Sequence, residues 1–399
     1  MPKVDLLNYV GKEQAYVKHY LLENYLSKWA YKIGSKWDAL VFIDGFAGPW
    51  QAHDKAFGDS SFGIAVRVIK KVVDDLERAL RRRVRGLCIF VEKKPVAFEA
   101  LNAFAEAHST EIVRAKALKG RFIDNIPRIQ ALLDSTSNNT FKFVFLDQKG
   151  WAATPIGALK PFVGSRSCEM LFTLMTSFLT RFVEREDLAP SYRGLFGRAD
   201  VLERIRSLPK GTGQREEAAV EEYCKSLREL CGFQHVSKAA IMDPSKEKVR
   251  YYLVFATNSL HGIEVFKRAE SEAAEKQDQV RHETRSKKTS QPGLPFASGP
   301  PPSPKTWELR TRYNHQAKEK ILALLVNSKL SKVPYSVLYG EAMTFPMVTP
   351  DDLLRWLEEL KPHIDIRMEG KHRRKPKWSK RDYIFIRDQA KLALIPNAL

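Results

Sequence analysis

The sequence is poor in cysteine. Its 399 residues include four, at Cys88, Cys168, Cys224 and Cys231. They are too scattered for a disulfide framework, and no Cys-x-x-Cys pair suggests a zinc site, so we expect reduced thiols and no bound metal. No apolar run approaches the roughly 20 residues that a bilayer span needs. The first residues hold no apolar signal segment. These absences predict a cytoplasmic protein that does not contact a membrane.

Three catalytic motifs are missing as well. No Gly-x-Gly-x-x-Gly run follows a strand-like segment, which excludes a nicotinamide dehydrogenase of the usual kind. No Walker sequence and no His-Glu-x-x-His helix is found either. Classes of enzyme that depend on those motifs therefore drop out.

The chain has an excess of positive charge. It carries 66 Lys and Arg against 47 Asp and Glu, a formal net charge of +19. Such a surface attracts polyanions by counterion release, so nucleic acid is the first partner to consider. A basic but unspecialised surface is the alternative. Hydrophobic residues make up 44% of the chain, enough for a sizeable core, and the length favours more than one domain.

A change of composition divides the chain. Residues 284–306 are rich in Pro, Gly and Ser, and they predict a disordered linker. It separates a body, residues 1–283, from a tail, residues 307–399. Within the body, residues 181–232 read as a helical insert.

The body alternates strand-like and helix-like segments, as expected for a parallel sheet with crossover helices. The strand-like runs are residues 39–48, 87–93, 111–117, 141–147 and 168–175, followed by a hairpin over 235–243 and 249–258. This is the plan of a Rossmann-like α/β fold with a seven-stranded sheet. Three runs are almost continuously apolar, as buried parallel strands must be, and each ends in a carboxylate: Asp44, Glu92 and Asp147.

Ligands bind at the carboxyl ends of such strands. Asp44 opens a loop whose glycines allow close approach of a ligand, although an ordinary turn explains it equally well. Glu92 is placed to accept hydrogen bonds from ribose hydroxyls, unless it pairs with a neighbouring lysine. Asp147, followed by Lys149 and Trp151, could orient a nucleophile or accept its proton while Trp151 stacks on a base. The alternative is a carboxylate that caps the next helix.

The tail predicts three short helices, the last with Thr349 as its N-cap, and then two strands around a basic loop. This order suggests a winged helix-turn-helix. Because the third helix is acidic, we expect the loop to engage the phosphate backbone rather than the helix to read bases. A protein-binding winged helix remains open. The candidate nucleic-acid-binding residues are Lys371, Arg373, Arg374, Lys375, Lys377, Trp378 and Lys380.

Three stretches together carry a resemblance to a known family. They are Lys18-His19 with Leu22, Tyr25-Leu26 and Trp29 in the leading helix, Phe42-Ile43-Asp44-Gly45-Phe46-Ala47-Gly48-Pro49, and Tyr252-Leu253-Val254-Phe255-Ala256-Thr257-Asn258. In this order they resemble the three-Cys-motif partner family, TcmP, across essentially the whole chain. That family resembles class I S-adenosylmethionine-dependent methyltransferases, ends in a winged helix, and is encoded beside a radical-enzyme-like protein that bears the three cysteines.

The resemblance implies S-adenosyl-L-methionine as cofactor and assigns residues to it. Asp44, Phe46, Ala47 and Gly48 would line the methionine moiety, Glu92 would hold the ribose, and Asp124 would lie near the adenine. Lys18 and His19 would face the cofactor's carboxylate or the substrate, although a packed interface histidine explains His19 as well. Asp147 and Lys149 are the candidate catalytic residues on their position after the fourth strand, not on the resemblance.

Two departures from the family pattern leave the activity open. Trp50 follows Gly48-Pro49 where the family tends to have glycine, and Gln148-Lys149 stand where it has Pro-aromatic. A methyltransferase acting on nucleic acid is the leading hypothesis. The alternative is a catalytically impaired adaptor that binds nucleic acid and a three-Cys-motif partner protein.

Overall fold

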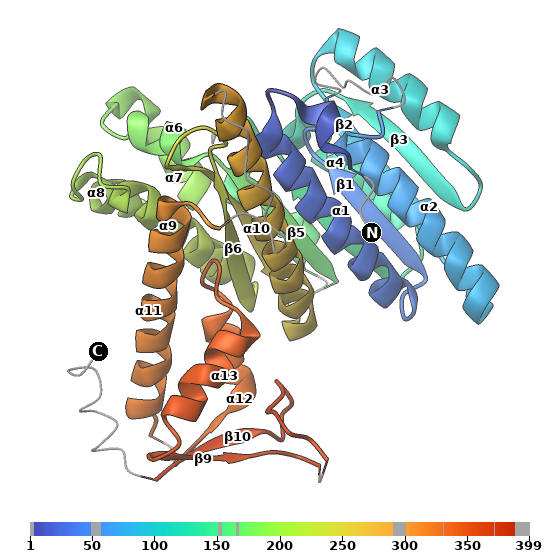
Figure 1. Cartoon of the computed structure of the whole chain (residues 1–399). Helices are drawn as coiled ribbons and strands as arrows, with labels where there is room; N and C mark the ends of the chain where they lie inside the picture. Colours follow the sequence, from blue (N-terminus) through green and yellow to red (C-terminus); the bar gives the residue numbers. More distant parts are fainter. Residues whose placement is uncertain are drawn as a thin grey trace.

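The computed structural model describes residues 4–48, 57–150, 154–164, 167–289, 301–329, 331–370 and 372–387. Its centre is a sheet of seven strands in the order β3-β2-β1-β4-β5-β7-β6, with helices on both faces (Figure 1). The strands are β1 (Ala39–Asp44), β2 (Arg85–Glu92), β3 (Val113–Lys119), β4 (Thr140–Leu146), β5 (Cys168–Leu174), β6 (His235–Met242) and β7 (Val249–Thr257).

The five strands β1 to β5 are parallel, and β7 lies antiparallel between β5 and β6. The predicted Rossmann-like seven-stranded sheet is thus confirmed, including its terminal hairpin. The pattern of β1 shows why: every residue from Ala39 to Asp44 is buried, as a central strand covered on both faces requires. The edge strand β3 instead alternates buried and exposed positions along much of its length.

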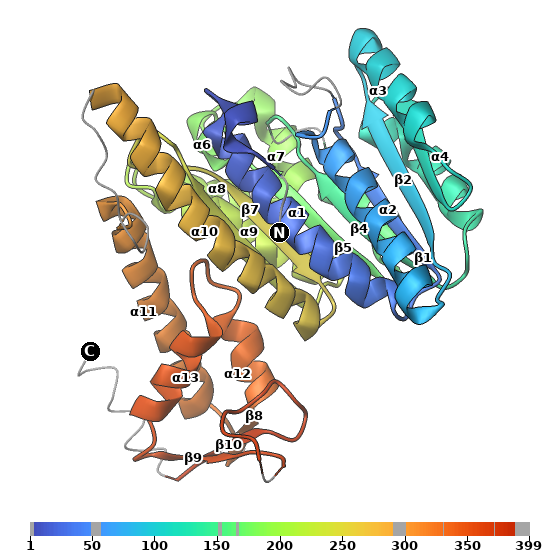
Figure 2. The same ribbon diagram turned by 45° about the vertical axis from the view of Figure 1, so that its right-hand side comes forward.

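Two layers of helices bury the two faces of the sheet. One layer holds α1 (Glu13–Gly34), α2 (Ser61–Leu80), α3 (Pro95–His108) and α10 (Leu260–Thr289). The other holds α4 (Phe122–Asp134), α5 (Lys160–Val163) and the helices between β5 and β6, which are α6 (Thr176–Arg181), α7 (Ala189–Phe196), α8 (Val201–Arg206) and α9 (Gln214–Cys231). In the first layer α2, α1 and α10 lie side by side (Figure 2).

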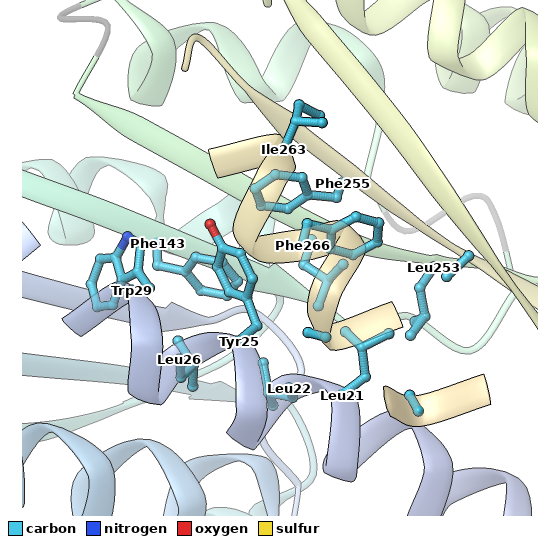
Figure 3. Close-up of a cluster of buried hydrophobic side chains, with 14 of the residues drawn as sticks. Leu21, Leu22, Tyr25, Leu26, Trp29, Phe143, Leu253, Phe255, Ile263 and Phe266 are labelled. Carbon is cyan, nitrogen blue, oxygen red and sulfur yellow. The ribbon is translucent and has the colours of Figure 1, made fainter. Parts of the chain in front are cut away.

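The leading helix α1 packs on the sheet through an aromatic cluster (Figure 3). The ring centroid of Tyr25 lies 4.9 Å from that of Phe255 in β7, and Phe255 stacks on Phe266 of α10 at 4.7 Å. The Tyr25 hydroxyl donates to the buried carboxylate of Glu169 in β5 at 2.6 Å. The apolar spacing read from the sequence therefore forms the face that fixes α1 to the sheet.

The tail consists of three helices and a small sheet. The helices are α11 (Pro304–Val326), α12 (Tyr335–Ala342) and α13 (Pro350–Glu359), and the sheet has the order β8-β10-β9, from β8 (Lys332–Pro334), β10 (Tyr383–Ile386) and β9 (Ile364–Arg367). Thr349 caps α13, as predicted, in a reciprocal capping box with Asp352. The strand β8 was not anticipated.

The segment expected to be a linker is helical at both ends. α10 continues to Thr289, and α11 begins at Pro304. Proline fits the first helical position, where its missing N–H costs nothing, and Ser303 caps the helix, so this Pro-rich stretch starts a helix. The prediction of a disordered stretch over the whole of 284–306 was wrong at these two ends.

The tail packs against the body rather than hanging free. The Ser237 hydroxyl in β6 donates to the carbonyl of Met343 at 2.7 Å. The hydroxyls of Tyr252 and Tyr313 lie 2.9 Å apart in a buried hydrogen bond. Apolar side chains of α11, α12 and α13 belong to the same buried cluster as those of α1 and α10. Body and tail thus share one core.

Candidate active site

A cavity of about 360 Å³ opens at the carboxyl edge of the sheet, where β1, β2 and β4 end. Its size falls within the range of small-molecule pockets. Its described lining comes from the loops after four strands: Gly45, Phe46, Val91, Glu92, Lys93, Lys94, Gly120, Arg121, Phe122, Ile123, Asp147 and Lys149. The structure therefore brings together four of the predicted residues, namely Phe46, Glu92, Asp147 and Lys149.

Glu92 ends β2 on the wall of this cavity and is 5% exposed. One of its oxygens, Oε1, accepts the backbone N–H of Lys94 at 2.6 Å. Its backbone carbonyl accepts the N–H of Gly120 at 2.9 Å, which ties the loop after β3 to the end of β2. A carboxylate held in this way at a strand end can accept hydrogen bonds from vicinal hydroxyls of a ribose.

Asp44 is fully buried, and both of its oxygens have protein partners. Oδ1 accepts the N–H of Phe46 at 3.0 Å, and Oδ2 accepts the hydroxyl of Ser61 at 2.6 Å. Burial raises the pKa of Asp44 to about 7, against the opposing effect of these hydrogen bonds, and the charge of Asp147 contributes to the rise. Asp44 thus shapes the loop after β1 and links it to the start of α2.

Asp147 forms an ion pair with Lys18, whose side chain is 10% exposed. Burial favours the protonated acid, but the charge and hydrogen bond of Lys18 hold the pKa of Asp147 below its usual range. A carboxylate with a low pKa is a weak proton acceptor at neutral pH. Although Lys18 and Asp147 are 129 residues apart in sequence, their pair joins α1 to the residue that follows β4.

His19 is neutral and contacts Tyr9, the last residue of the short 3₁₀ helix η1 (Leu6–Tyr9). The hydroxyl of Tyr9 donates to the carbonyl of Asp59 at 2.6 Å and lies 2.9 Å from Nδ1 of His19. Since the hydroxyl proton is used, Nδ1 must carry the imidazole proton, which leaves Nε2 as an acceptor. Burial and the charge of Lys18 lower the pKa of His19 to about 3. His19 therefore offers no positive charge to a cofactor carboxylate.

The remaining cofactor residues of the prediction differ in position. Ala47 is buried, and its N–H donates to the carbonyl of Val91 at 2.9 Å, which joins the loops after β1 and β2. Asp124 is exposed and forms a bidentate ion pair with Arg121, at 2.7 and 2.8 Å. Arg121 holds the pKa of Asp124 below its usual range.

Phe122 and Ile123, rather than Asp124, face the cavity at the place assigned to adenine. Gly48 is the last described residue of its loop, so Trp50 lies outside the described residues, as does Trp151. The stacking role considered for Trp151 therefore stays a prediction.

Basic side chains gather around the cavity more than the sequence led us to expect. Lys93, Lys94 and Arg121 join Lys149 in the lining. Partial burial, followed by the charge of Lys94, lowers the pKa of Lys149. The Lys93-Lys94 pair was visible in the sequence only as a possible partner of Glu92. Among the described residues, no cluster of three or more His, Cys, Asp or Glu has the geometry of a metal site.

The basic loop between β9 and β10 is built around Asp382, which is fully buried. Its carboxylate accepts the N–H of Glu369 at 2.9 Å and the N–H of Lys377 at 2.6 Å, and it pairs with Arg373. Nothing in the local sequence marked Asp382, because its partners come from both sides of the loop. Arg373 is therefore a structural residue of the loop, with an 18% exposed side chain.

The other predicted nucleic-acid residues differ in exposure and partners. Trp378 packs edge-on against His261 of α10, with ring centroids 4.1 Å apart, and so is not presented for stacking on a base. Lys375 is exposed and lies 3.6 Å from Asp351. Arg374, Lys377 and Lys380 are exposed, and Lys371 lies outside the described residues.

Comparisons with known proteins give distant similarity in fold. A candidate methyltransferase from Porphyromonas gingivalis W83 is 14% identical with a TM-score of 0.25, over 58% of this chain and 40% of that one. A DUF574 family protein from Streptomyces avermitilis MA-4680 is 11% identical with a TM-score of 0.31, over 60% of this chain and 83% of that one. No protein-family model and no curated protein sequence matches the chain. The fold assignment above therefore rests on the strand order.

Along the described chain, no helix combines the length and the apolar character needed to cross a bilayer.

Proposed function

We propose that the protein is an S-adenosylmethionine-dependent methyltransferase of the TcmP type that acts on nucleic acid. The observation that carries the proposal is the cavity at the carboxyl edge of a sheet with the order β3-β2-β1-β4-β5-β7-β6, with Glu92 at the end of β2. In this proposal Glu92 holds the ribose, the Gly45-Phe46 backbone borders the methionine moiety, and Phe122 and Ile123 pack on the adenine.

The chain's own residues define what the site contributes. The bound cofactor would supply the electrophilic methyl group. The Lys18–Asp147 ion pair ties α1 to the end of β4 beside the cavity, and Lys149, the other proposed catalytic residue, lines the same cavity. Methyl transfer to nitrogen or oxygen needs mainly alignment of the acceptor and a group to take up the proton.

Calorimetric titration with S-adenosylmethionine tests the cofactor. Because charge-assisted hydrogen bonds contribute about 1.5–3 kcal/mol, Glu92→Gln should weaken binding by roughly 10- to 100-fold. Glu99→Gln, an exposed carboxylate on the neighbouring α3, is the matched control and should bind like the wild type. No heat with the wild-type protein, or equal affinities for the two variants, contradicts the proposal.

One observation favours a second function, a methyltransferase-like adaptor. Asp147 forms an ion pair with Lys18. The next residue, Gln148, is 2% exposed, and its Oε1 has no hydrogen-bond partner among the described residues. In that case the protein binds the cofactor, nucleic acid and a three-Cys-motif partner protein without methyl transfer. Transfer of labelled methyl groups to total nucleic acid distinguishes the two: labelling supports the enzyme, and cofactor binding without labelling of nucleic acid or protein supports the adaptor.

A further inference from the structure

The basic loop of the tail contacts the body at the edge opposite the cavity. β7 is antiparallel to β5, so its last residue, Thr257, lies level with the beginnings of the parallel strands. α10 starts there, and the ring of its His261 packs against Trp378 of the basic loop. We call this the amino edge. A strand such as β4 spans about 23 Å at roughly 3.3 Å per residue, so the basic loop and the cavity are separated by about that distance.

Basic residues of the body meet the loop at this edge. Lys32 near the end of α1 lies 2.7 Å from His261, and Arg82 after α2 donates to the carbonyl of Gly34 at 2.8 Å and to Asp38 at 3.0 Å. These contacts form a continuous path from the loop, over the end of α1, to the end of α2. The exposed cations along this path, the amino-edge band, are Lys32, Lys36, Arg78, Arg81, Arg83, Arg85, Arg374, Lys377 and Lys380.

Two cations of the band have acidic partners: Arg78 lies 3.1 Å from Asp75, and Arg83 lies 3.3 Å from Glu77. Lys36, Arg81 and Arg85 have no carboxylate within ion-pair distance among the described residues, and the same holds for the three cations of the loop. Partial burial is the main cause of the lowered pKa of Lys32; the charge of Glu264 opposes it, and the charges of Lys36 and Arg268 add to it.

Arg81 is an exposed cation at a backbone position that suits glycine better. It ends α2 in the left-handed conformation, with φ 52° and ψ 27°, and its N–H bonds the carbonyl of Glu77 at 3.1 Å. Glycine is the usual residue at this place, because a Cβ carries a steric cost there. Here the site holds an exposed guanidinium instead.

We propose that the amino-edge band binds the phosphate backbone of duplex nucleic acid, with the ends of α1 and α2 and the basic loop acting as one surface. Neighbouring helices pack about 8–10 Å apart, so α2, α1 and α10 present a row about 20 Å long. With one phosphate per 3.4 Å of each strand, the row matches about six phosphates.

A duplex fits this surface better than a single strand. Single-strand sites offer aromatic rings for base stacking, whereas Trp378 is packed on His261 and Trp37 is partly buried against Phe141. The surface of α13 is unsuited to a groove, since Asp351 and Glu358 are exposed there. The inference rests on the nucleic-acid partner proposed above, but not on the cofactor or on methyl transfer.

The test measures binding of a fluorescein-labelled 20-base-pair duplex by anisotropy over a range of salt concentrations. A helix-end variant carries Lys36→Gln, Arg81→Gly and Arg85→Gln, and a loop variant carries Arg374→Gln, Lys377→Gln and Lys380→Gln. A control of equal net charge carries Lys116→Gln, Arg193→Gln and Lys320→Gln, which are exposed on other elements.

Each band variant should weaken binding at least about tenfold and reduce the slope of log K against log[salt] by about 2–3, since each lost phosphate contact contributes about 0.9. The control should bind like the wild type. A helix-end variant that matches the control overturns the proposal, as does polyglutamate of equal charge binding as tightly as the duplex.

Glu92→Gln should leave duplex binding unchanged. Loss of cofactor binding alone therefore counts against the proposed methyltransferase, and loss of the variants' effect on the duplex counts against the band.

Discussion

Asp44 illustrates how a single residue combines a structural and an electrostatic role. Its position at the end of β1 suggested direct contact with a ligand, whereas in the structure its oxygens accept the N–H of Phe46 and the hydroxyl of Ser61. A buried carboxylate that retains two donors keeps its loop in one conformation. Asp44 therefore holds the loop after β1 in one conformation.

The raised pKa of Asp44 predicts a pH dependence of stability. Between its ordinary value of 3.8 and about 7, the folded protein retains a proton that the unfolded chain has released. The free energy of unfolding of the wild type, relative to Asp44→Asn, should therefore fall as pH rises through this window, by about 2–4 kcal/mol. Urea unfolding at pH 4.5, 6.0 and 7.5 measures the difference.

Asp74→Asn, an exposed carboxylate on α2, is the control for that series and should run parallel to the wild type. His19 acts in the opposite direction, because its lowered pKa makes stability rise with pH up to about 6.5. It is present in all three proteins, so the comparison removes its effect. Parallel profiles for Asp44→Asn and the wild type would contradict the prediction.

The strand ends were predictable from the sequence, and their partners were not. A buried parallel strand leaves a continuous apolar run, so the carboxylates Asp44, Glu92 and Asp147 could be placed at one edge from pattern alone. Whether a carboxylate faces a cavity, a hydroxyl or a lysine depends on segments remote in sequence. Lys18 and Asp147 are 129 residues apart, and only the packing of α1 brings them together.

At the scale of elements, the side chain of Glu169 in β5 links that strand to α1 and β7. It is 2% exposed in β5 and accepts hydrogen bonds from Tyr25 of α1 at 2.6 Å and from Thr257 of β7 at 2.7 Å. Burial raises the pKa of Glu169. The first turn of α10 passes so close to Glu169 that only a glycine fits at position 262.

Gly262→Ala should destabilise the protein by about 1–3 kcal/mol, the usual cost of an overpacked core. A Cβ at Gly262 would overlap Oε1 of Glu169 and Oγ1 of Thr257, and these atoms are held by their hydrogen bonds. Gly157→Ala meets nothing within 4 Å and is the control. Thermal unfolding measures both, and a Gly262→Ala protein as stable as the control refutes the packing described.

The tail shows where composition misleads at this scale. Proline and serine at residues 303–304 read as linker, yet they are the cap and first residue of α11. The helices of the tail were predictable from their periodicity and from Thr349 as a cap. Their docking on α10 and β6 was not, because a tail surface that packs on the body has no local pattern to distinguish it from any other apolar face.

Considered as a whole molecule, the body and tail are joined by buried contacts that should couple their unfolding. The buried pair Tyr252–Tyr313 and the bond from Lys267 to the carbonyl of Phe345 at 2.8 Å cross the junction, within a shared apolar core. We expect a single transition in calorimetry, with the van't Hoff enthalpy equal to the calorimetric one. Two separated transitions would show independent domains.

The tyrosine pair itself allows a sharper test. Tyr252→Phe and Tyr313→Phe should each destabilise the whole chain by about 1 kcal/mol, and the double variant by less than the sum, because the two hydroxyls share one hydrogen bond. Chemical unfolding of the four proteins measures the coupling. If the losses of the two single variants add up to that of the double variant, the two hydroxyls do not share a hydrogen bond.

The cavity and the amino-edge band lie at opposite edges of one sheet, so a nucleotide that receives a methyl group at the cavity would lie outside the stretch of duplex that the band holds. The central claim is that the cavity holds an adenosyl group. A crystal structure with S-adenosylhomocysteine tests it most directly. We predict the ribose hydroxyls on Glu92 and the adenine against Phe122 and Ile123. An empty cavity at saturating ligand, or the ligand bound at another site, would contradict the account.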